Sequence, residues 1–320
     1  MNCHPDRSEG TAFREAHQMS LNDSEFIRQM EGWGGRFLAD QPLSEYTSLG
    51  VGGPADLIVL TRLDALEPVV EGLRQRGIRW GLLGGGTNVL PVDEPFHKVF
   101  LQLAAGCGEL VFEGRIVHVP AAASLGRTVM ECAKRNLGGM EGLVGVPGSV
   151  GGALRMNAGA YGTQIGPLVR SVTVFRGATG RREELAADAI GFTYRHSSFA
   201  PDDIMLSVTL ELLERPFREI LDQVKGYNEK RRRSQPVKEM SAGCIFKNPP
   251  GLSTGRLIDE LGLKGHRIGG AVISERHANF IVNRDHGTAE DIFRLMDLIR
   301  ERIRKAHGLE LEEEVIVWKN

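Results

Sequence analysis

The sequence predicts an α+β fold in which two lobes precede a further domain. Helical and strand-like hydrophobic patterns alternate along most of the chain, and the pattern becomes mainly helical after Pro216. A glycine-dense loop at residues 84–88 directly follows the apolar run 78–83, and a second glycine-dense stretch covers 142–162. Glycine lets main-chain N–H groups approach a ligand closely, so these loops are candidates for a ligand-binding backbone. A glycine-rich crossover between two elements is the alternative interpretation of either loop alone.

The chain is expected to consist of a tail and two domains. Residues 1–23 are polar and lack a hydrophobic period, which predicts a disordered tail, and Met19 offers a second possible start. The expected parts are the tail over 1–23, a first domain over 24–216 with lobes of about 24–92 and 93–216, and a second domain over 217–320.

Composition limits the classes of partner. The net charge of −2 favours neither nucleic acid nor an anionic membrane as the main partner. No run of about 18 apolar residues is present, and the N-terminus lacks an apolar signal core. Cys3, Cys107, Cys132 and Cys244 have neither metal-ligand spacing nor disulfide-framework density. We therefore expect no metal, and free thiols in a reducing cytoplasm.

The first lobe is expected to alternate helices and strands. Ser24 is a plausible N-cap of a short helix that runs toward Gly34, because Phe26, Ile27 and Met30 share one face. The other expected elements are a strand over 57–60, a helix over 63–73 that Gly77 ends, a short apolar run over 78–83 and the loop 84–90.

The second lobe is expected to be rich in strands. Ser124 is the expected cap of a helix that carries Leu125, Val129 and Cys132 on one side. The expected strands cover 99–103, 110–112, 116–119, 169–175 and 204–213.

In the second domain, Thr288 followed three residues later by Asp291 indicates a capping box, and Gly308 marks the end of the same helix. The other expected elements are a helix from Phe217 to Gln235, an apolar segment over 241–250, a helix around 257–261, and strands over 279–283 and 310–318.

The glycine loops lack the common phosphate-binding fingerprints. Residues 84–88 can form a nest of N–H groups, with the Thr87 hydroxyl as a further donor. No Lys-Ser or Lys-Thr pair follows, which excludes a Walker loop, and G-x-G-x-x-G is absent there and in 145–152. A dinucleotide in this chain would therefore be held by a scaffold other than the Rossmann fold.

An ordered set of motifs resembles one enzyme family. From about Tyr46 to the C-terminus the chain reads YTSLGVGGPAD, GLLGGGTNVL, GLVGVPGSVGGALRMNAGAYG, YRHSSF, SAGCIFKNP and KGHRIGGAVISERHANFIVN. Together they resemble the UDP-N-acetylenolpyruvoylglucosamine reductases, flavoenzymes of bacterial peptidoglycan synthesis. The short spacing between YR and SAGC is similar to the family's second type, which lacks a tyrosine-bearing loop over the substrate.

The resemblance implies both fold and chemistry. It implies a two-lobed FAD-binding domain of the vanillyl-alcohol-oxidase (PCMH) type over 24–216, and an α/β substrate-binding domain over 217–320 that ends in a catalytic strand. The implied cofactors are FAD and NADPH. The implied reaction passes a hydride from NADPH through FAD to the enolpyruvyl double bond, and an enzyme side chain then protonates the enol.

Three catalytic residues are implied by their motif positions. Arg195 of YR would hold the enolpyruvyl carboxylate with two parallel hydrogen bonds. Cys244 stands at the proton-donor position, where many members carry serine, and a thiol with an ordinary pKa of about 8.5 is a better acid than a hydroxyl. A surface ion pair for Arg195 and a small buried side chain for Cys244 are the alternatives that the residues alone leave open.

Glu314 is the implied third catalytic residue. The family pattern resembles L-E-P-E-V-R, whereas this chain has Glu313 for the proline and Ile316 for the basic residue. Strand alternation would place Glu312 and Glu314 on one face and Glu313 on the other. The motif alignment favours Glu314.

The resemblance also implies binding residues. The expected FAD-binding residues are Tyr46, Gly52, Gly84, Gly85, Gly86, Thr87, Asn88, Val89, Leu90, Gly145, Val146, Pro147, Gly148, Ser149, Gly151, Gly152, Asn157, Gly159 and Ala160. The expected substrate-binding residues are Tyr194, Arg231, Lys247, Asn248, His277 and Asn279, with Arg232 and Arg233 as alternatives to Arg231.

Two other functions remain open at this point. One is an FAD-dependent oxidase or dehydrogenase of a small hydroxy acid, which would not need the donor in SAGC. The other is a flavin-carrying or nucleotide-sugar-binding protein without turnover. The expected partner is a small-molecule substrate, UDP-N-acetylglucosamine enolpyruvate, and the expected state is a cytoplasmic monomer.

Overall fold

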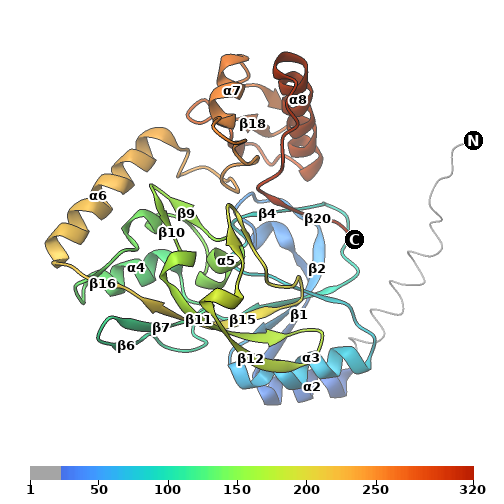
Figure 1. Cartoon of the computed structure of the whole chain (residues 1–320). Coiled ribbons are helices and arrows are strands. Elements are labelled where there is room, and N and C mark those ends of the chain that lie inside the picture. Colours follow the sequence, from blue (N-terminus) through green and yellow to red (C-terminus); the bar gives the residue numbers. More distant parts are fainter. Residues whose placement is uncertain (1–22) are drawn as a thin grey trace, which may run out of the picture.

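A computed structural model describes residues 23–320 as three packed units (Figure 1). The tail expected over 1–23 lies outside the described residues except for Asp23. No helix among the described residues is long and apolar enough to cross a membrane. The same residues contain no group of three or more His, Cys, Asp or Glu side chains that could hold a metal ion.

The first lobe is a four-stranded sheet covered by two helices. The strand order is β1-β2-β5-β3, with β1 antiparallel to β2 and the other neighbours parallel. The helices α2 and α3 bury Phe26, Leu66, Val69 and Leu73 against this sheet. The bounds are α2 Ser24–Trp33, β1 Gly35–Pro42, β2 Pro54–Leu60, α3 Leu66–Gln75, β3 Trp80–Leu82, β4 Val89–Pro91 and β5 Val99–Leu103.

The second lobe is an antiparallel five-stranded sheet, β12-β11-β15-β7-β6, with α4 and α5 packed in its core. Its bounds are β6 Val111–Glu113, β7 Ile116–Pro120, α4 Leu125–Ala133, α5 Val150–Arg155, β11 Val169–Arg176, β12 Arg181–Ala186 and β15 Ile204–Glu211. Short ladders join β8 Leu137–Gly138 to β16 Leu213–Glu214, β9 Gly159–Ala160 to β10 Thr163–Gln164, and β13 Phe192–Thr193 to β14 His196–Ser197. Short 3-10 turns lie at Leu43–Glu45, Leu63–Ala65, Glu141–Leu143, Gly166–Leu168 and Ala187–Ala189.

The third unit packs α7 and α8 with a small antiparallel sheet, β17-β18-β19. Its bounds are α7 Thr254–Glu260, β17 Arg267–Ile268, β18 Ala271–Ile273, β19 Ile281–Asn283 and α8 Ala289–His307. Between the second lobe and this unit runs α6, Phe217–Ser234, whose Ile220 and Val224 belong to the core of the second lobe. The expected boundary at Pro216 therefore precedes a helix that packs against the second lobe, which comes before it in the chain.

The chain returns to the first lobe at its C-terminal end. Strand β20, Ile316–Trp318, lies parallel to β4 (Figure 1). The Trp318 ring stacks on Phe100 with centroids 4.7 Å apart. Asp93 adds a second connection, because its carboxylate accepts from the Gly52 N–H at 3.4 Å and from the Ala289 N–H of α8 at 2.7 Å. The first lobe is thus joined to the C-terminal segment by backbone pairing and to the third unit by the Asp93 carboxylate.

Several expected boundaries are confirmed and others are wrong. Ser124 caps α4, Thr288 and Asp291 form the capping box of α8, and α8 ends at Gly308 in a left-handed conformation. The cap of α2 is Asp23 and not Ser24, because the Asp23 carboxylate accepts from two N–H groups of the first turn.

The strand expected over 310–318 is wrong in its first half, because residues 312–314 instead bond to the segment 245–247. The strand expected over 279–283 begins only at Ile281, after a turn in which the Phe280 N–H donates to the His277 carbonyl.

Candidate active site

Arg195 lies at the turn of the β13–β14 hairpin. Its φ of 54° is in the left-handed region, which costs a non-glycine residue about 1–2 kcal/mol. Its guanidinium donates from Nη1 to the Gly159 carbonyl at 2.9 Å. Strain of this kind at an arginine identifies the turn as a functional candidate.

Glu314 is the acidic partner of Arg195. Glu314 Oε1 lies 2.6 Å from Arg195 Nε, and the two side chains are 14% and 22% exposed. The contact is off the hydrogen-bond direction of Nε, so it is an ion pair. Burial raises the pKa of Glu314 above its usual range, while the charges of Arg195 and Lys247 act in the opposite direction. The carboxyl is therefore held nearer to protonation than a surface glutamate.

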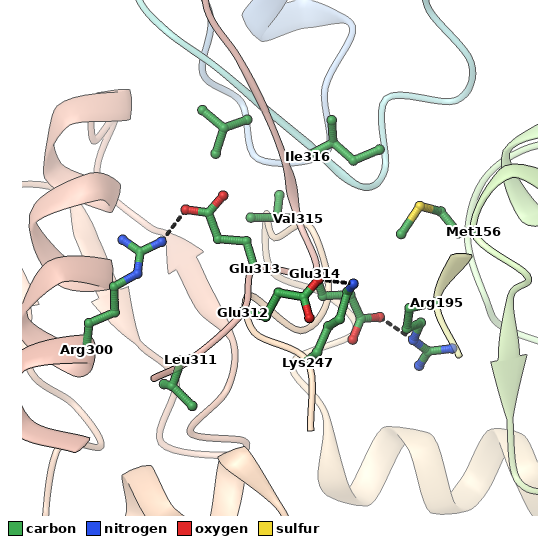
Figure 2. Close-up of a pocket in the computed structure, with 11 residues that line it drawn as sticks. Met156, Arg195, Lys247, Arg300, Leu311, Glu312, Glu313, Glu314, Val315 and Ile316 are labelled. Atoms are coloured by element: carbon green, nitrogen blue, oxygen red, sulfur yellow. Dashed lines mark hydrogen bonds and ion pairs between the residues drawn. The ribbon is translucent and has the colours of Figure 1, made fainter. Parts of the chain in front are cut away.

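The three consecutive glutamates point to different partners (Figure 2). Glu312 pairs with Lys247, Glu314 with Arg195, and Glu313 with Arg300 of α8. The expected alternation is present, although only Glu313 forms a β-bridge, with Phe246. Glu314 is the member of this run that contacts Arg195.

Cys244 lies next to this ion pair. The Glu314 N–H donates to the carbonyl of Ile245 at 2.8 Å, which fixes the glutamate beside residue 244. The thiol is surrounded by protein although the residue keeps some exposed surface. Burial and then the charge of Glu314 raise the pKa of Cys244 to about 12, against the opposite effect of Arg195 and Arg231. The thiol is therefore protonated throughout the physiological range.

A cavity of about 580 Å³ opens at this point (Figure 2). The second lobe and the third unit line it together with the C-terminal segment: Met156 and Arg195 come from the second lobe, Lys247 and Arg300 from the third unit, and residues 311–317 run into β20. Ile316, which replaces a basic residue of the family pattern, is among the lining residues. Positive and negative groups alternate around the opening.

The two glycine loops lie against each other beside the cavity. The Thr87 hydroxyl donates to the Pro147 carbonyl at 3.3 Å. A Cβ on Gly148 would lie 2.7 Å from that hydroxyl oxygen, and one on Gly86 would lie 1.9 Å from the Tyr46 carbonyl oxygen. Glycine at these two positions is therefore required by contacts between loops. Ser149 caps α5 and accepts from the Gly152 N–H at 3.2 Å.

These loops fit a dinucleotide. Among the described residues, the N–H groups of 84–87 donate to no protein acceptor, and Gly84 and Gly85 are exposed. A cluster of unused N–H donors suits the oxygens of a diphosphate. The N–H of Gly151 is instead bonded to the Ala121 carbonyl at 2.7 Å. The unused N–H groups of residues 84–87 therefore fit the diphosphate of FAD. The start of α5 lies against this loop.

The other expected cofactor residues have varied surroundings. The Asn88 amide donates to the Glu314 carbonyl at 3.0 Å, which joins the loop to the segment that carries Glu314. Val89 and Leu90 are buried in β4, Gly52 has a φ of 125°, and the Tyr46 hydroxyl contacts Gln41. The remaining members are Gly145, whose carbonyl accepts from Arg231; Val146, packed on the second-lobe core; Gly159 and Ala160 of β9; and Asn157, considered below.

The substrate candidates gather at the third unit. Arg231 donates to the Gly145 carbonyl, and its charge acts to lower the pKa of Cys244. Arg233 instead pairs with Glu229 at the surface. The Asn248 N–H donates to the Tyr194 hydroxyl at 3.4 Å, which brings the two candidates together. The geometry therefore favours Arg231 over Arg233.

His277 and Asn279 have structural partners. The Asn279 amide donates to the Phe246 carbonyl at 2.7 Å and accepts from its N–H at 3.1 Å. His277 Nδ1 accepts from the Asn279 N–H at 3.3 Å, and burial lowers the pKa of His277. Both side chains shape the segment that follows Cys244.

Sequence reasoning missed several residues of the site. Met156, Arg300 and Leu311 line the cavity, and Glu312 forms an ion pair with Lys247. Met156 lies inside the motif GLVGVPGSVGGALRMNAGAYG, so a signal for this residue was present in the sequence. The other three depend on chain segments that meet only after folding.

Comparison with known proteins relates most of the chain to one enzyme family. Residues 54–186 match a family described as an FAD binding domain, and residues 235–318 match one described as the C-terminal domain of UDP-N-acetylenolpyruvoylglucosamine reductase. The chain is 39% identical to the UDP-N-acetylenolpyruvoylglucosamine reductase of Moorella thermoacetica, over 88% of this chain and 93% of the relative. For the Bacillus subtilis reductase the identity is 35%, with the same coverage.

A solved structure agrees with these relatives. The reductase from Thermus caldophilus superposes with a TM-score of 0.77 at 38% identity, and the match covers 89% of this chain and 99% of that one. The expected fold class, a two-lobed FAD-binding domain of the vanillyl-alcohol-oxidase type followed by a substrate-binding domain, is confirmed. This chain belongs to the UDP-N-acetylenolpyruvoylglucosamine reductase family.

Proposed function

We propose that the protein reduces UDP-N-acetylglucosamine enolpyruvate to UDP-N-acetylmuramate, with FAD and NADPH as cofactors, in the synthesis of peptidoglycan precursors. The observation that carries this proposal is the convergence of Arg195, Glu314 and Cys244 beside two glycine loops. These residues come from three distant segments, and each supplies a group that reduction of an enol ether needs.

Arg195 would bind the enolpyruvyl carboxylate. A guanidinium is always charged and can donate two parallel hydrogen bonds to a carboxylate. As hydride adds to the methylene carbon, negative charge develops on the carboxylate side of the double bond, and a fixed cation stabilises that charge. The Gly159 carbonyl and the left-handed turn fix the guanidinium in place.

Cys244 would hold the proton that completes the reaction. Its pKa of about 12 keeps the thiol protonated, and the carbon that bears the ether oxygen is the expected acceptor. The developing enolate is a strong enough base to take this proton. The neighbouring Arg195 and Arg231 would stabilise the thiolate that remains.

Glu314 would assist from the other side of Arg195. Its carboxylate pairs with the guanidinium that the substrate carboxylate would need. A substrate that takes Arg195 leaves Glu314 in a buried site without its full counter-charge, and such a carboxyl favours the neutral form. Glu314 would therefore hold a proton while the substrate is bound.

The glycine loops would hold the cofactor. The N–H groups of 84–87 are the proposed diphosphate donors, and the facing loop 145–149 is the proposed second wall. These residues would hold FAD, which would supply hydride transfer from NADPH to the enolpyruvyl group. Arg231, Lys247, Asn248 and Tyr194 are the proposed contacts for the nucleotide sugar.

The proposal includes a cellular location and an assembly state. Cys107, Cys132 and Cys244 are free, as expected in a reducing compartment. We place the protein in the cytoplasm as a monomer, because the three units of one chain supply every group named above.

Two half-reactions test the proposed function. Under anaerobic conditions, NADPH should bleach the flavin absorbance of the purified protein, and UDP-N-acetylglucosamine enolpyruvate should restore it. The Arg195→Ala variant is the control and should be bleached but restored far more slowly. A protein that bleaches and never recovers with this substrate would overturn the proposal. Bleaching by lactate-like hydroxy acids would instead indicate the oxidase.

A further inference from the structure

Asn157 connects the glycine-dense stretch to the hairpin that carries Arg195. Its Nδ2 donates to the Thr193 carbonyl at 2.9 Å, and its Oδ1 accepts from the Gly166 N–H at 3.0 Å. The residue is only 3% exposed. A second, longer contact of 3.5 Å joins Nδ2 to Gln164. Both polar ends of the side chain are therefore engaged within the protein and not toward a cofactor.

The hairpin of Arg195 depends on such outside contacts. Strands β13 and β14 have two residues each, and Thr193 is paired with His196 across the turn. The Ser197 hydroxyl donates to the Arg155 carbonyl at 2.7 Å, at the end of α5. A two-residue ladder with a left-handed arginine at its turn has little stability of its own. The segment 155–159 therefore sets the position of the turn.

We propose that Asn157 is a positioning residue for Arg195, acting through the Thr193 carbonyl. This inference rests on the function proposed above and deepens it. Asn157 follows the C-terminal end of α5, whereas the proposed cofactor-binding loop 145–149 precedes its N-terminal end. One short helix would therefore fix both the hydride source and the residue that binds the carboxylate. Asn157 has a φ of 40°, which asparagine tolerates better than most residues.

The variant Asn157→Asp tests the link with little change of shape. It keeps the acceptor for the Gly166 N–H and replaces the donor to the Thr193 carbonyl with an oxygen. Displacement of Arg195 by a fraction of an ångström should lower kcat/KM for the enolpyruvyl nucleotide sugar by about tenfold or more. Asn157→Asp should retain its flavin content and the rate at which NADPH reduces the flavin, as Arg195→Ala does. The loss should fall on the step in which the nucleotide sugar restores the oxidised flavin.

Asn136→Asp is the control for the left-handed backbone conformation and the retained acceptor, at an exposed position. Asn136 also follows a helix, has a φ of 60°, and uses Oδ1 to accept from the Phe217 N–H at 2.9 Å. The substitution retains that acceptor, so kcat/KM should stay within about twofold of the parent.

A double-mutant cycle separates positioning from a general effect. In the Arg195→Ala background, Asn157→Asp should change kcat/KM by no more than about twofold, because the residue that it positions is gone. A full additional loss in that background would overturn the proposal. Loss of flavin from Asn157→Asp, with Arg195→Ala retaining it, would instead assign Asn157 to the cofactor.

Two further outcomes are distinguishable. If Asn157→Asp does not fold, Asn157→Gly, which tolerates a φ of 40° and removes the donor to the Thr193 carbonyl, carries the same cycle. A parent protein that never turns over the nucleotide sugar overturns both the function and the positioning role. A parent that turns over, with equal losses in both backgrounds, overturns the positioning role alone.

Discussion

At the scale of single residues, the site combines a buried acid, a buried thiol and one strained arginine. The thiol and the carboxyl both have a raised pKa, because burial disfavours their charged forms. The arginine has the opposite preference and supplies the positive charge. Two proton-holding groups thus flank one permanent cation, as a reduction that ends in protonation requires.

Substitution of Cys244 tests its role as the proton donor. Cys244→Ser should retain activity, whereas Cys244→Ala should lose about 10²–10⁴ in the rate of product formation, as expected for loss of a general acid. Because the thiol pKa is about 12, parent activity should not decline through thiol ionisation between pH 7 and 10. Steady-state rates over that range check both points. An alanine variant with a near-parental rate would exclude Cys244.

Glu314→Gln tests the competition for Arg195. Glu314 is neutral below its raised pKa and ionised above it, and only the ionised form competes with the substrate carboxylate. The parent KM for the nucleotide sugar should therefore rise with pH above this pKa, and the KM of the glutamine variant should be flat and lower. Its kcat should fall at least about tenfold. A parental pH profile in the variant would contradict this.

At the scale of elements, one surface cluster joins segments of the third unit. Arg284, directly after β19, contacts Glu275 at 2.6 and 2.9 Å and Glu239 at 2.6 Å. This hydrogen bonding to Arg284 lowers the pKa of Glu275 to about 2. Glu239 and Glu275 lie just before the segments that carry Cys244 and His277, so the cluster fixes the entry to both.

Glu275→Gln should destabilise the protein only where the parent carboxylate is ionised. The stability that this carboxylate contributes is present above its ordinary pKa of 4.5 and is lost as pH falls through about 2. Since the pair is partly exposed, the loss at pH 6 should be at most about 1 kcal/mol. Urea unfolding at pH 6, 4 and 3 measures it. Glu301→Gln, at an exposed position of α8, is the control, and a pH-independent difference would contradict the prediction.

Local signals were sufficient for much of the fold. Helix caps at Ser124 and Thr288 and the strands of the second lobe depend on neighbouring residues and on hydrophobic period, which the sequence displays directly. The false half of the last strand shows the limit. Residues 311–315 alternate as a strand would, yet they bond to residues 245–247, and no local pattern records such a partner.

The site was predictable only in part for the same reason. The motifs identified Arg195, Cys244 and Glu314, but their contact depends on a hairpin, a loop and a C-terminal segment meeting in space. The pairing of Lys247 with Glu312 and the engagement of Asn157 with Thr193 are long-range contacts of this kind. Long-range contacts carry no signature within either segment.

At the scale of the whole molecule, β20 completes the first lobe with residues from the far end of the chain. It pairs with β4, which begins directly after Asn88, and β20 itself begins two residues after Glu314. The loop Gly84–Asn88 and the Glu314 segment therefore lead into the same two-stranded sheet, and this pairing links the position of the proposed cofactor loop to that of Glu314.

Trp318→Ala should weaken this link. Loss of the stacking contact with Phe100 should lower the free energy of unfolding by up to about 3 kcal/mol and raise the Kd for FAD about tenfold, because β4 and the adjoining loop lose their support. Thermal unfolding and FAD titration measure the two effects. Trp33→Ala on α2, which is far from the loop in the chain and packs on Phe26, is the control and should lose stability alone. Unchanged FAD affinity in Trp318→Ala would contradict the link.

The pairing of β20 with β4 also sets an order of events during synthesis. Ribosomes make the chain from its N-terminus, so β4 and the Gly84–Asn88 loop emerge long before the strand that completes their sheet. A nascent chain can fold its second lobe early, but it cannot finish the cofactor site until residues 316–318 leave the exit tunnel. Chains that end before residue 316 should therefore bind flavin more weakly than the full chain.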